Sequence, residues 1–84
     1  RPNPFNPTTT IDFEVKGSSH VELSVYDIQG RLIRTLENGY REAGVHHTVW
    51  DGRDSSGRPA PSGVYVYRIV SGETTEARRM LLLK

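Results

Sequence analysis

Short runs of alternating hydrophobic and polar residues, separated by glycine and proline, are the dominant pattern of this sequence. Segments 11–16 and 21–26 place an apolar residue at every second position, which is typical of a β-strand with one buried face. The 8 glycines and 5 prolines recur every several residues, and no uninterrupted segment has the length and period of an amphipathic helix. Six or seven short strands between such turns predict an all-β protein, an antiparallel β-sandwich of about seven strands.

Further strands are expected after the first two. Residues 64–70 are nearly apolar on both alternating sides, with Tyr65, Tyr67 and Ile69 on one and Val64, Val66 and Val70 on the other, which indicates a strand in the middle of a sheet. Prolines at 59 and 61 exclude segment 58–63 from a central strand, because proline donates no ladder hydrogen bond. The remaining expected strands are 31–36, ended by Asn38-Gly39, then 45–50 and 74–83.

Three local features predict how the sandwich is held together. Asp27-Ile28-Gln29-Gly30 has aspartate first and glycine fourth, the preference of a type I turn. Trp50 is the single tryptophan, and its strand predicts a core anchor between the sheets. Tyr65 follows Ser62-Gly63 at the start of the most apolar strand, where sandwiches often bond a tyrosine hydroxyl back to a connecting loop.

Composition excludes several classes of protein. The length of 84 residues fits one small domain. With 11 basic and 10 acidic residues, the chain lacks the field expected of a nucleic-acid binder. No run approaches the roughly 18 apolar residues of a membrane-spanning helix. The absence of cysteine excludes disulfides, thiolate metal sites and cysteine nucleophiles. The chain begins with neither methionine nor a signal-like stretch, so we expect a piece of a longer protein.

Catalytic and metal-binding constellations are not predicted. His46 and His47 are adjacent on a strand and point to opposite faces, and His20 belongs to a different strand. Asp51 and Asp54 fall short of a calcium-loop pattern and fit turn capping better, which leaves calcium binding there open. The sequence has neither a nucleophile-elbow motif nor a glycine-rich phosphate loop. We therefore predict no enzyme activity and no cofactor.

The end of the chain is unusually apolar. Met80-Leu81-Leu82-Leu83 lies between Arg78-Arg79 and Lys84. A strand of this kind is either buried on both faces or presents one hydrophobic face to a partner. Basic residues at both ends would guard it against aggregation.

Motifs along almost the whole chain carry a resemblance to a known family. They begin with Pro2-Asn3-Pro4-Phe5-Asn6-Pro7 and Thr8-Thr9-Thr10-Ile11. They continue through segments 25–31, 44–46, 50–54, 62–68 and 79–84. In this order they resemble the C-terminal sorting domains of the type IX secretion system, which are similar to the immunoglobulin-like domain of the flagellar hook-capping protein.

The resemblance implies an immunoglobulin-like sandwich that exports and attaches a larger protein. An extended lead at 1–7 would join the upstream cargo, a secreted enzyme, to one sandwich at 8–84. Implied partners are an outer-membrane translocon and a sortase-like peptidase, and the implied location is the bacterial outer-membrane surface, reached through the periplasm. Lys84 directly after an apolar strand would fit a chain end. The implied recognition residues are Asn3, Pro4, Asp27, Gly30, Gly63, Tyr65, Arg79, Met80, Leu81, Leu82, Leu83 and Lys84.

Two other functions are compatible with the same pattern. An assembly scaffold of the hook-capping type would use the sandwich to contact other subunits. A carbohydrate-binding module would need coplanar exposed aromatics, for which Tyr26, Tyr40 and Tyr67 are the candidates.

Overall fold

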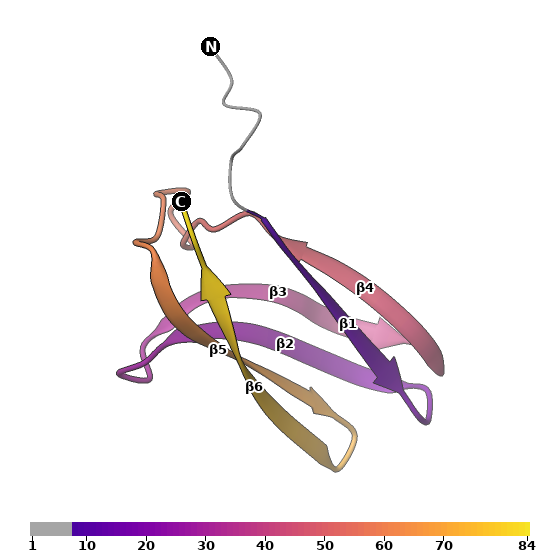
Figure 1. The fold of residues 1–84 in the computed structure, drawn as a ribbon. Coiled ribbons are helices and arrows are strands. Elements are labelled where there is room, and N and C mark those ends of the chain that lie inside the picture. The colour runs from indigo at the N-terminus through magenta and orange to yellow at the C-terminus, as the bar shows by residue number, and fades with distance from the viewer. Residues whose placement is uncertain (1–7) are drawn as a thin grey trace.

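Two antiparallel sheets pack face to face in the computed structural model, which describes residues 8–84 (Figure 1). The smaller sheet pairs β1 with β4, and the larger has the order β3-β2-β5-β6. The strands are β1 (Thr9–Val15), β2 (Ser19–Asp27), β3 (Leu32–Arg41), β4 (Gly44–Trp50), β5 (Gly63–Ser71) and β6 (Thr74–Leu82).

The predicted all-β, immunoglobulin-like antiparallel sandwich is confirmed, with six strands in the described part of the chain. The expected lead at 1–7 lies outside the described residues. Within residues 8–84 there is no helix long and apolar enough to cross a membrane.

The hydrophobic core lies between the two sheets and follows the alternation read from the sequence. Ile11, Phe13 and Val15 of β1 pack on residues of β2 and β5 to form one buried cluster. Trp50, fully buried at the end of β4, contributes to a second cluster with Val25, Ala60, Tyr65 and Leu82. The expected role of Trp50 as an anchor between the sheets is therefore confirmed.

The third strand runs further than its sequence suggests. The expectation that Asn38-Gly39 ends it is wrong, because β3 continues to Arg41 and pairs with β2 along its whole length. Two register shifts in this pair, after Leu23 and after Val25, absorb the extra residues of β3. Asn-Gly favours a turn only where the chain must reverse, and here it continues in the ladder.

The central position of β5 is confirmed, since it lies between β2 and β6. Its inward side is covered by the core, and Tyr65 and Ile69 are buried there. Its outward side is not covered, and Val64 is 40% exposed. The apolar residues on the inward side of β5 are therefore part of the core, whereas those on its outward side form exposed hydrophobic surface.

Candidate functional site

A tight turn joins β2 to β3 at one end of the larger sheet. The carboxylate oxygen Oδ1 of Asp27 accepts the backbone N–H of Gln29 and of Arg31, each at 2.9 Å. Its Oδ2 accepts the Arg31 Nε–H at 2.8 Å. Gly30 adopts a φ of 84°, a conformation that residues with a side chain rarely adopt. The predicted turn is confirmed, including the bond from the aspartate to the residue two positions on.

These hydrogen bonds lower the pKa of Asp27 below its ordinary value of 3.8, with the backbone N–H of Arg31 as the largest cause. A carboxylate whose folded pKa is lowered stabilises the fold above its unfolded pKa, and loses that contribution as the pH falls through the folded pKa. We expect Asp27→Asn to melt at a lower temperature than the parent at pH 7. The difference should shrink as the pH falls below about 3.8, because the parent then loses the stabilisation that its ionised carboxylate provides.

Thermal melts followed by circular dichroism across this pH range test the prediction. Arg31→Gln is the matched control, because it keeps both backbone N–H donors and removes only the guanidinium. It should cost less than Asp27→Asn at pH 7. A pH-independent difference between Asp27→Asn and the parent would contradict the prediction.

Beside this turn, Tyr65 ties β5 to the loop that precedes it. The buried Tyr65 hydroxyl donates to the carbonyl of Pro61 at 2.6 Å, as the sequence predicts. Asp27 is its register partner on β2. Burial, and secondarily the charge of Asp27, raise the pKa of Tyr65 above 10.0.

We expect Tyr65→Phe to lower the free energy of unfolding by about 1–2 kcal/mol, because the Pro61 carbonyl loses its donor. The raised pKa adds a pH dependence: the parent keeps its full stability below about pH 10 and loses some as the pH rises further. Urea unfolding between about pH 8 and 11 should show the gap between parent and variant narrowing at high pH. A gap that widens would contradict this.

Most of the other residues implied by the resemblance also lie at this end of the sheet. Gly63 pairs with Leu82, and the Lys84 backbone N–H donates to the Ser62 hydroxyl at 3.1 Å. Met80 and Leu82 face the core, whereas Leu81 and Leu83 are 55% and 68% exposed. Arg79 is exposed on β6, where it lies opposite Val66 of β5. Asn3 and Pro4 lie outside the described residues.

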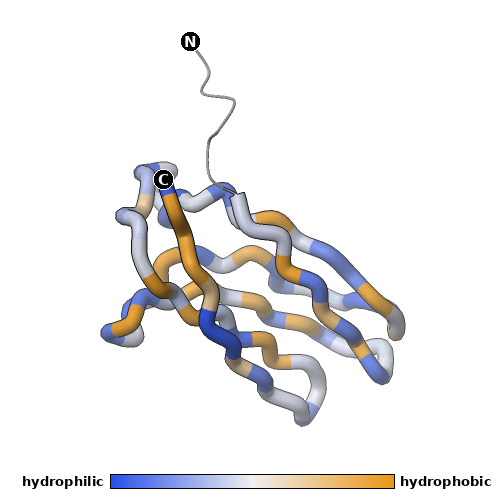
Figure 2. Tube along the Cα trace, viewed as in Figure 1, coloured by the Kyte–Doolittle hydropathy of each residue, from blue (hydrophilic) through white to orange (hydrophobic). Residues whose placement is uncertain are grey.

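The same end of the larger sheet carries a hydrophobic surface on its outward face. The register places Leu32, Tyr26 and Val66 in one row across β3, β2 and β5. Val64 pairs with Leu81 beside that row. Figure 2 shows the hydrophobic colour along the last part of β6, close to the C-terminus. We call this surface the outer patch; its residues are Tyr26, Ile28, Leu32, Val64, Val66 and Leu81.

Two shallow hollows lie in the surface of the outer patch. One of about 340 Å³ is lined by Tyr26, Ile28, Val66, Arg68 and Ala77 among others. A neighbouring one of about 270 Å³ is lined by Val64, Arg79, Met80 and Leu81. Ala77 is the register partner of Arg68, and its short side chain leaves space at the first hollow.

Two arginines flank the outer patch. The Arg68 guanidinium lies over the Tyr26 ring, 5.4 Å from its centroid, and donates to the Tyr26 hydroxyl at 3.3 Å. Arg79 stands opposite Val66 on the neighbouring strand. Among residues 8–84 the ion pairs involve Arg31, Arg34, Arg41 and His47, so neither Arg68 nor Arg79 has a carboxylate partner there.

The sequence indicated that the end of β6 is either buried or presents a hydrophobic face to a partner. It did not indicate that β2, β3 and β5 contribute side chains to the same surface. The available indication was the apolar outward side of segment 64–70, which was attributed to burial in mid-sheet. Leu32 gave no comparable indication, because the register shifts of β3 decide which face it occupies.

The three histidines are held separately, as predicted. His46 stacks on Phe13 with ring centroids 5.6 Å apart, and its Nε2 is 2.7 Å from the Glu42 carbonyl. His47 lies on the other face against Asp12, and His20 against Asn38. The described part of the chain contains no group of three or more potential metal-ligating residues.

The loop between β4 and β5 uses both of its aspartates in turns. Oδ1 of Asp51 accepts the Arg53 backbone N–H at 3.0 Å and the Arg34 guanidinium at 3.2 Å. Oδ1 of Asp54 accepts the N–H groups of Ser56 and Arg58. These bonds fit the turn-capping interpretation of the two aspartates, rather than a calcium loop.

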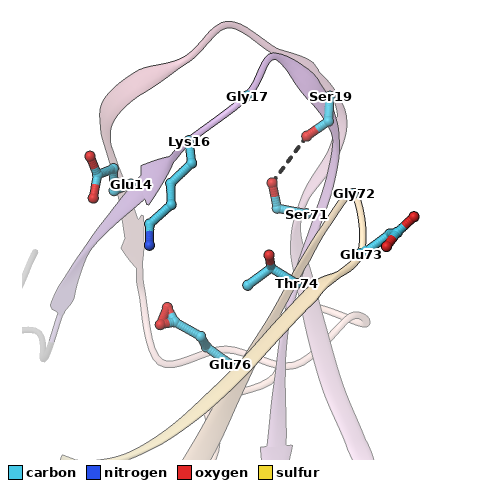
Figure 3. A pocket seen from close by; sticks show the side chains of 9 residues that line it. All are labelled: Glu14, Lys16, Gly17, Ser19, Ser71, Gly72, Glu73, Thr74 and Glu76. Atoms are coloured by element: carbon cyan, nitrogen blue, oxygen red, sulfur yellow. Dashed lines mark hydrogen bonds between the residues drawn. The ribbon is translucent and has the colours of Figure 1, made fainter.

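A polar hollow of about 430 Å³ lies at the opposite end of the molecule, between the β1–β2 and β5–β6 turns (Figure 3). Lys16 extends into it between Glu14 and Glu76, and Ser19 and Ser71 share a hydrogen bond of 3.0 Å at its wall. Its lining carries charges of both signs, from Lys16 and from glutamates, so it offers no concentrated binding chemistry.

The three tyrosines considered for carbohydrate binding do not form a platform. Tyr67 packs inward against both core clusters. Tyr26 and Tyr40 lie at opposite ends of the β2–β3 pair, where Tyr40 is opposite His20. Coplanar stacking on a sugar by all three is therefore excluded by the register.

The comparisons with known families, proteins and structures all find FlgD proteins. The family model described as FlgD Ig-like domain matches residues 3–75. The chain is 39% identical over 61 residues to the basal-body rod modification protein FlgD of Salmonella typhimurium, and 38% identical to that of Escherichia coli K12. Each alignment covers 69% of this chain and 26% of the relative. The chain thus spans about a quarter of the length of these relatives.

Solved structures of FlgD proteins share the fold. The protein from P. aeruginosa superposes with a TM-score of 0.72 at 29% identity, covering 89% of this chain and 60% of that one. A structure from Xanthomonas campestris, described as giving insights into the hook capping essential for flagellar assembly, has a TM-score of 0.71. Its identity is 18%, over 92% of this chain and 56% of that one, and this match bears on the fold alone.

These relatives contradict the expected export function. The type IX sorting role is wrong, and with it the translocon, the sortase-like peptidase and the outer-membrane surface location, because the matches are to flagellar FlgD proteins. The motifs misled for a physical reason. Asp27, Gly30, Trp50 and Tyr65 build a turn, a core and a loop tie, so they specify the sandwich rather than its use.

Proposed function

This chain belongs to the FlgD Ig-like domain family, and from that premise we propose that it is a non-catalytic assembly module of the hook-capping type. In this role the sandwich contacts other protein subunits while a flagellar hook is built. The observation that carries the proposal is the family match over residues 3–75, together with 39% identity to a basal-body rod modification protein.

The described surface supports a binding role more than a catalytic one. The carboxylates that could take part in catalysis instead accept hydrogen bonds from backbone N–H groups of turns, as at Asp27, Asp51 and Asp54. The outer patch, by contrast, exposes large hydrophobic side chains such as Leu32 at 54% and Leu81 at 55%. Contiguous apolar surface of this kind typically marks a protein contact.

The test is made in the full-length protein and in the organism that produces it. One variant lacks residues 8–84, and a second carries an unrelated β-sandwich of similar size in their place. Hooks are counted by electron microscopy, and swimming is measured in soft agar. Both variants should fail to build hooks although they accumulate to parental levels. Normal hooks in either variant would overturn the proposal.

A further inference from the structure

The outer patch combines apolar area with positive charge, and this combination restricts what can cover it. Its hydrophobic side chains come from all four strands of the larger sheet and from the β2–β3 turn. Its two flanking cations, Arg68 and Arg79, have no carboxylate within the described part of the chain.

Arg68 is positioned before any partner arrives. The Tyr26 ring lies beneath its guanidinium, and the Tyr26 hydroxyl accepts one of its N–H groups. An arginine fixed by stacking still has donors free for a carboxylate, and loses little conformational freedom when it binds one. A hollow of about 340 Å³ lies beside it.

A second copy of this chain fits the patch poorly. A two-fold contact is self-complementary, so the patch of one copy would face the same patch of the other. Both copies would then bring Arg68 and Arg79 to the same interface, and Asp27 of the neighbouring turn is already bonded to Arg31. Like charges facing each other across an interface disfavour that pairing.

We propose that the outer patch docks an acidic, aliphatic segment of another protein subunit, whose carboxylates pair with Arg68 and Arg79. The aliphatic side chains of the segment cover Tyr26, Val64, Val66 and Leu81. The inference rests on the proposed function in one respect, which is that the partner is taken to be a protein subunit.

The experiment uses the full-length protein in its own cells, with a photo-crosslinking amino acid in place of Ile28, which is 74% exposed at the rim of the patch. The same amino acid in place of Val45, 67% exposed on the smaller sheet, is the control for general proximity. Cross-linked segments are identified by mass spectrometry. Capture should occur from position 28 and not from 45, and the captured segment should carry aspartate or glutamate among aliphatic residues.

Charge reversal tests the role of the arginines. The double variant Arg68→Glu/Arg79→Glu should lower the cross-link yield about tenfold. Arg78→Glu is the matched control: Arg78 is also exposed on β6 and pairs with the inward-facing Tyr67, so its reversal should change the yield less than about twofold. Circular dichroism melts verify that all variants fold.

The inference would be overturned if position 28 gave no cross-link or if position 45 captured the same segment equally well. It would also be overturned by capture of a second copy or of a basic segment, or by a cross-link yield that the double reversal leaves unchanged. These results differ from a failure of the proposed function. Hooks that need residues 8–84 but form without the cross-link would refute only the inference. A cross-link to an acidic segment in cells whose hooks do not need these residues would refute only the proposed function.

Discussion

Replacing Trp50 with alanine is expected to lower the free energy of unfolding by about 3–5 kcal/mol. The side chain is fully buried and packs edge-on against Tyr65, with ring centroids 5.1 Å apart. Its indole N–H donates to the Arg53 carbonyl at 2.9 Å. Truncation would leave a cavity between the sheets and remove the shorter of the two hydrogen bonds to that carbonyl, which the Arg34 guanidinium also contacts at 3.4 Å. Domains of this size have a total stability of roughly 4–13 kcal/mol, so the loss is a large fraction of the whole.

Urea unfolding followed by far-ultraviolet circular dichroism measures this effect without depending on the tryptophan itself. A decrease in melting temperature of roughly 20 °C should accompany it. Trp50→Phe is the control, because it keeps an aromatic ring and removes the indole N–H; it should cost about 1–3 kcal/mol. A Trp50→Ala variant within about 1 kcal/mol of the parent would show that the second core cluster does not depend on this residue.

The core residues were predictable because each is specified by a local pattern. Alternation identified the inward positions of β1 and β2, and Trp50 and Tyr65 were recognisable by type and by position beside turns. The aspartate turn was equally local: all the groups that the Asp27 carboxylate bonds lie within four residues of it. Such features need no knowledge of which strand pairs with which.

The outer patch was not predictable because it depends on strand order and register. Leu32, Tyr26 and Val66 are distant in sequence and become neighbours only through two different strand pairs. The contact of Arg68 with Tyr26 spans 42 residues. The continuation of β3 beyond Asn38-Gly39 is another long-range effect, because the ladder with β2 overrides a local turn preference.

Function was misassigned for a related reason. A motif that stabilises a sandwich is retained wherever that sandwich is used, so its presence identifies the fold and not the partner. Residues that would distinguish partners lie outward, where folding places few demands on them. The outer patch is such a place, since Val64 and Leu81 are more exposed than the buried residues next to them in sequence, Tyr65 and Leu82.

The last two leucines of β6 separate folding from binding most sharply. Leu82 is 1% exposed and packs in the cluster that contains Trp50, whereas Leu81 is 55% exposed on the outer patch. We expect Leu82→Ala to lower the free energy of unfolding by about 2–4 kcal/mol, because it opens a cavity in the core. Leu81→Ala should change it by no more than about 0.5 kcal/mol.

Chemical denaturation of the two variants side by side makes the comparison, and each serves as the control for the other because the substitution is identical. The β-strand period of two places the adjacent side chains on opposite faces, so any slip of β6 by one residue would exchange their roles. A larger loss of unfolding free energy from Leu81→Ala than from Leu82→Ala would therefore reveal such a slip. The slip would place the exposed hydrophobic side chains of β6 away from the outer patch. With the register as described, Leu81 contributes little to folding, and its exposed area remains available for a partner.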